Sequence, residues 1–212
     1  MELTAIFKSW HLGDGNYPLF SKGMMVNLSF EMGVQSIEAA PPASSDSFVH
    51  EGSGLYRFSG RVIRQYDIDG TNLCIIEVSN FRFYACGQEV RNLAAGTTVR
   101  GTGMLALDHY LWVEYLDKYE DPPNLFYDLR VERLTEVQMP ERFITRHAQG
   151  MGHPTSLFPE QYGPEDTKVV ESMLREAGPP QTIENYRPLF WIVDFSDLDV
   201  QTRVARTFIG AG

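Results

Sequence analysis

Apolar and polar residues alternate over long stretches of the first two thirds of the chain. In residues 24–32 the even positions are all apolar, and three of the four odd positions are polar. The same period of two recurs in residues 55–68 and 125–132. A period of two places every second side chain on one face, which is typical of a strand with one buried face. The pattern therefore predicts a chain that is mainly β.

Residues 55–140 are predicted to form a barrel core. The dipeptide Asp69-Gly70 tolerates positive φ at both positions and predicts a hairpin after the long first strand. About five strands with short connections favour a β-barrel or a curled antiparallel sheet. The long first strand and the short segment between the third and fourth strands resemble the pattern of an OB-fold, a barrel that binds oligonucleotides or oligosaccharides.

The regions on either side of this core are predicted to pack on it. Residues 1–54 are expected to form an N-terminal β segment. Residues 141–212 begin with an irregular stretch, followed by apolar residues at helical spacing that predict a helix over about 165–177. A nearly continuous apolar run predicts a strand over about 189–195. The expected fold is mainly β with a C-terminal helix–strand extension, and α+β overall.

Composition and charge limit the classes of protein to consider. The 212 residues are 43% hydrophobic and 22% charged, which is ordinary for a globular protein and argues against disorder. The formal net charge of −10 makes nucleic acid an unfavourable partner. Two cysteines are too few for a disulfide scaffold. No basic leader and no membrane-length apolar run is visible, so we expect a cytoplasmic protein without a membrane segment.

The sequence lacks the common motifs of catalytic and cofactor sites. It has no phosphate-binding loop, no Gly-x-Ser-x-Gly and no His-Glu-x-x-His. We therefore assign no catalytic residue, no metal and no cofactor. A hydrolase or metal enzyme is the second alternative, because His147 and His153 lie six residues apart and would need loop carboxylates to complete a site.

An acidic, aromatic-rich stretch carries the leading hypothesis. Residues 101–140 hold eight acidic residues against three basic ones. Acidic groups around aromatic anchors suit a basic protein partner, because charge steers the encounter and rings supply binding energy. Small size, acidity and the lack of a catalytic motif match the profile of an immunity protein that neutralises a toxin. The predicted partner-binding residues are Trp112, Glu114, Asp117, Tyr119, Glu120 and Asp121.

A basic stretch on the predicted barrel carries the first alternative. Residues 55–100 hold six arginines against four acidic residues. Binders of single strands combine a cationic groove with stacking rings, so this stretch favours an OB-like module for single-stranded nucleic acid or oligosaccharide. Arginine on an outer sheet face also pairs commonly with a carboxylate on the next strand. The groove residues under this alternative are Arg57, Arg61, Arg82 and Tyr110.

Overall fold

The computed structural model describes residues 2–8, 10–13, 17–42, 44–68, 70–108, 122–138, 164–174 and 189–200. Over these residues the fold is mostly β, with 67% strand and almost no helix, and it contains a closed five-stranded barrel with additional strands. The predicted mainly β fold is thereby confirmed. One short helix, α1 (Trp10–Gly13), follows the first strand.

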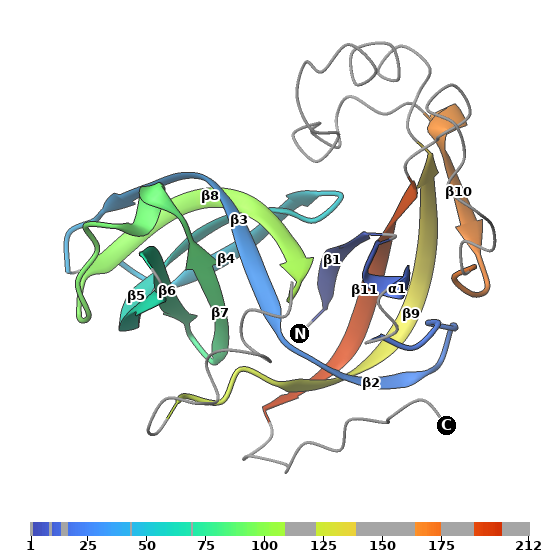
Figure 1. Cartoon of the computed structure of the whole chain (residues 1–212), viewed down its shortest axis with the longest axis horizontal. Coiled ribbons are helices and arrows are strands. Elements are labelled where there is room, and N and C mark those ends of the chain that lie inside the picture. Colours follow the sequence, from blue (N-terminus) through green and yellow to red (C-terminus); the bar gives the residue numbers. More distant parts are fainter. Residues whose placement is uncertain are drawn as a thin grey trace.

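Five strands close the barrel on the left of Figure 1. They are β3 (Phe30–Ala39), β5 (Leu55–Ile68), β6 (Thr71–Val78), β7 (Phe81–Cys86) and β8 (Thr98–Leu107). The pairing runs β8–β3–β7–β6–β5, and β5 pairs back to β8. All these pairs are antiparallel except β3–β7, which is parallel through Glu31 and Tyr84. A 3-10 helix, Gln88–Val90, lies between β7 and β8 in the chain.

Local sequence explains two features of the barrel. The β5–β6 hairpin forms at the predicted turn, where the backbone N–H of Gly70 donates to Asp67 Oδ1 at 2.8 Å. Gly60 and Gly101 permit close strand approach, because an added Cβ would lie only 2.4 Å from the carbonyl oxygens of Glu77 and Ser36, respectively.

The other strands extend the barrel into one eleven-stranded sheet. Strand β11 pairs along β9 and with β1, and β1 joins the barrel by a parallel bridge from Ile6 to Ala106 of β8. Strands β2 and β10 both pair with β9, while β4 pairs with β5. The bounds are β1 (Leu3–Lys8), β2 (Met25–Leu28), β4 (Ser47–Gly52), β9 (Tyr127–Gln138), β10 (Thr167–Val170) and β11 (Leu189–Val200).

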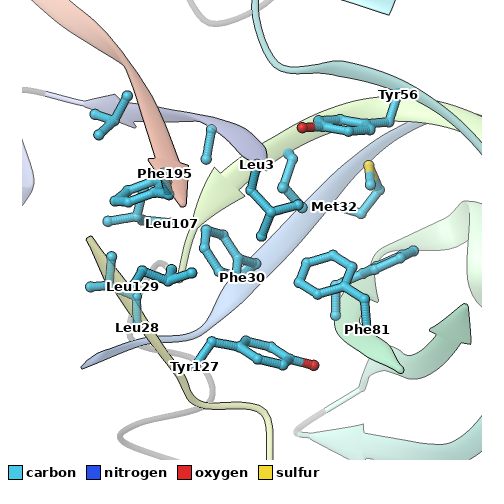
Figure 2. Close-up of a cluster of buried hydrophobic side chains, with 14 of the residues drawn as sticks. Leu3, Leu28, Phe30, Met32, Tyr56, Phe81, Leu107, Tyr127, Leu129 and Phe195 are labelled. Carbon is cyan, nitrogen blue, oxygen red and sulfur yellow. The ribbon is translucent and has the colours of Figure 1, made fainter. Parts of the chain in front are cut away.

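The main hydrophobic core runs from the barrel into the extension without a break. Figure 2 shows Phe30 between Phe81 on the barrel side and Phe195 on the extension side. The rings of Phe30 and Phe195 are 6.1 Å apart, and those of Phe81 and Tyr127 are 5.2 Å apart. Because all four side chains are buried, the two parts share one packed interior.

The structure contradicts the helix predicted over about 165–177. A 3-10 helix covers Pro164–Asp166, and β10 follows it directly. The residues at helical spacing do not share a face, because Met173 is buried while Val169 and Leu174 are exposed. Pairing with the edge of β9 supplies the backbone hydrogen bonds that a helix would have made internally. Residues 175–177 lie outside the described residues, whereas β11 covers the strand predicted over about 189–195.

Candidate functional site

The six residues predicted to bind a partner all lie outside the described residues, as do Tyr110, His147 and His153. The described chain stops at Asp108 and resumes at Pro122. The structure therefore describes the two flanks of the acidic segment, residues 112–121.

The first flank, Asp108, is held at the end of β8 by hydrogen bonds with Tyr84, Ser29 and Tyr17. Tyr84 Oη donates to Oδ1 at 2.5 Å, and Ser29 Oγ donates to Oδ2 at 3.1 Å. The backbone N–H of Asp108 donates to the Ser29 carbonyl at 3.0 Å, and Tyr17 Oη donates to the Asp108 carbonyl at 2.8 Å. Asp108 is fully buried, so the bonds from Tyr84 and Ser29 replace the water that its carboxylate would otherwise bind.

The second flank, Leu125, is buried in a small hydrophobic cluster on the outer face of the barrel. Two residues further along the chain, Tyr127 Oη accepts from the Arg82 backbone N–H at 2.5 Å and donates to the Arg82 carbonyl at 3.1 Å. Tyr84, which binds Asp108, belongs to the same cluster, so both flanks meet the barrel at one place. The cluster contains Tyr66, Ile68, Leu73, Ile75, Tyr84 and Leu125.

Titratable groups gather beside this cluster, at the seam between β3 and β7. Cys86 Sγ donates to Glu31 Oε1 at 3.1 Å. Burial, together with the charge of Glu31, raises the pKa of Cys86 to about 12. Burial also lowers the pKa of Lys8, and the carboxylate of Glu31 opposes that shift. The thiol therefore stays protonated at neutral pH and lacks the thiolate that nucleophilic catalysis needs.

Sequence reasoning missed this grouping of Lys8, Glu31, Cys86 and Asp108. The residues come from four different strands or strand ends, and no motif or spacing in the chain connects them. The pairing of β3 with β7 and β8, together with that of β1 with β8, brings them together.

The three arginines of the alternative groove all bind carboxylates. Arg61 and Arg82 flank Glu77 in one cross-strand row, at 3.7 Å and 2.6 Å from its oxygens. Arg57 instead pairs with Glu51 at 3.2 Å. The structure thus brings Arg61 and Arg82 together around a shared carboxylate and gives Arg57 a separate partner.

Among the described residues, no group of three or more His, Cys, Asp or Glu side chains is arranged to hold a metal ion. Within the same residues, no helix is long and apolar enough to cross a membrane. Comparison with protein-family models, with curated proteins and with solved structures gives no match.

Proposed function

We propose that this chain is a non-catalytic binding protein that recognises a basic protein partner through its acidic, aromatic segment, residues 112–121. The segment offers carboxylates that steer a positively charged partner and rings that become buried on contact. The residues expected to carry the contact are Trp112, Glu114, Asp117, Tyr119, Glu120 and Asp121.

The fixed flanks of the segment are the observation that carries this proposal. Asp108 and Leu125 are both fully buried, and both meet the outer face of the barrel around Tyr84. Binding residues commonly lie on loops that a rigid scaffold holds at both ends. A segment held this way loses less conformational entropy on binding than a free tail would lose.

The overall profile supports an immunity-type role, in which the partner is a basic toxin that this protein neutralises. The formal charge of −10 favours rapid association with such a partner. Cys74 and Cys86 are free thiols, which suits a reducing compartment such as the cytoplasm.

Affinity capture from a lysate of the source organism tests the proposal. The first variant bait carries Asp117→Lys, Glu120→Lys and Asp121→Lys. It is compared with the unchanged protein used as bait. A matched control bait carries Glu2→Lys, Glu165→Lys and Glu171→Lys, three exposed residues whose replacement changes the net charge equally. We expect a basic protein to bind the unchanged and control baits and to be lost from the first variant. Equal capture by all three baits would contradict the proposal.

The pairing order of the barrel favours an OB-like module as a second candidate. In an OB-fold, strands one to three form a meander, strand four returns to strand one, and strand five lies between strands three and four. Strands β5, β6, β7 and β8 follow this order, and β3 occupies the fifth position although it comes first in the chain. This order supports the proposal of a circularly permuted OB-like barrel.

The face that binds ligands in OB-folds is partly covered here, which favours the acidic binding protein over the OB-like module. That face lies over strands two and three, here β6 and β7. Leu73 and Ile75 on it are already buried with Leu125, and the charges of Arg61 and Arg82 are offset in part by Glu77. Titration with single-stranded oligonucleotides at low salt, followed by tryptophan fluorescence, separates the two candidates. We expect no change, and saturable binding that requires Arg57, Arg61 and Arg82 would favour the OB-like module.

A further inference from the structure

We draw no further inference here: the strongest candidate, the side-chain cluster of Lys8, Glu31, Cys86 and Asp108 at the seam between β3 and β7, carries nothing further, because it belongs to the site already described and, within the residues that the structure describes, no observation beyond the contacts of the cluster itself points to a ligand there.

Discussion

The Cys86 thiol donates its hydrogen to Glu31 at the seam between β3 and β7. Burial is the main cause of its raised pKa, and the carboxylates of Glu31, Glu89 and Asp108 add to the shift. A thiol with a pKa of about 12 is ionised in roughly one molecule in 10,000 at pH 8, compared with about a quarter of unperturbed thiols. This low thiolate fraction opposes nucleophilic catalysis by Cys86.

Alkylation of native Cys86 by iodoacetamide at pH 8 is therefore expected to be at least about 100-fold slower than alkylation of the unfolded chain. Glu31→Gln should speed the reaction, because it removes a negative charge beside the sulfur. Peptide mapping after timed labelling measures both rates. Rapid native labelling of Cys86 would contradict the proposed environment of the thiol.

The same shift makes stability depend on pH at the alkaline end. Because the folded pKa lies above the unfolded one, the folded state holds the proton more tightly. The stabilisation is complete below about pH 9 and is lost as pH rises toward 12. The free energy of unfolding should fall across this range, and less steeply in Cys86→Ser, when followed by urea denaturation.

Single residues also show which contacts the sequence does not predict. The sequence predicts arginines on the outer faces of the barrel strands. Pairing with carboxylates on neighbouring strands is one of the two interpretations given for them. The sequence does not predict that Arg61 and Arg82 share Glu77, because that contact depends on the register of three strands. Register follows from turn geometry and from the bulge between Val62 and Arg64, which the alternating pattern does not reveal.

At the scale of elements, close packing of the barrel strands depends on residues without a side chain. An added Cβ at Gly101 would meet the Ser36 carbonyl oxygen at 2.4 Å and the Phe58 ring at 2.8 Å. At Gly33, also within a strand, the nearest atom would be the Met104 carbonyl oxygen at 3.6 Å, an ordinary contact. The two glycines therefore form a matched pair that separates crowding from the general effect of adding a methyl group.

Gly101→Ala is expected to lower the free energy of unfolding by about 2 kcal/mol or more, because β8 and β3 must move apart. Gly33→Ala should change it by less than about 1 kcal/mol. Urea denaturation of both variants measures the difference. Equal effects would show that the strands around Gly101 are packed more loosely than the short distances to Ser36 and Phe58 indicate.

Elements differ in how well their sequence predicts them. Alternation predicts the long strands β5 and β9, because buried residues alternate with more exposed ones along most of each strand. The short strand β10 forms through its pairing with β9, so its local pattern alone predicts a helix that the structure does not contain. Likewise, nothing in residues 30–39 indicates that β3 closes the barrel between β7 and β8, because that position is set by contacts distant in sequence.

At the scale of the whole molecule, barrel and extension are joined by a common core and by Asp108. This carboxylate binds Tyr84 of β7 and Ser29, the residue that links β2 to β3. Asp108→Ala should leave both buried hydroxyl groups without this acceptor and lower the free energy of unfolding by about 2–4 kcal/mol. Asp108→Asn keeps an acceptor oxygen and should cost less. Thermal melts of the two variants test this order, and an equal or reversed order would contradict the account.

The function proposed for the whole molecule rests on electrostatic attraction to the segment between Asp108 and Leu125. The most direct test is the association rate of the captured partner, measured by surface plasmon resonance over salt concentrations from about 50 to 500 mM. The rate should fall steeply with salt for the unchanged protein and for the Glu2, Glu165 and Glu171 control. It should be slower and nearly independent of salt for the Asp117, Glu120 and Asp121 variant. Identical rates and identical salt dependence in all three proteins would contradict the account.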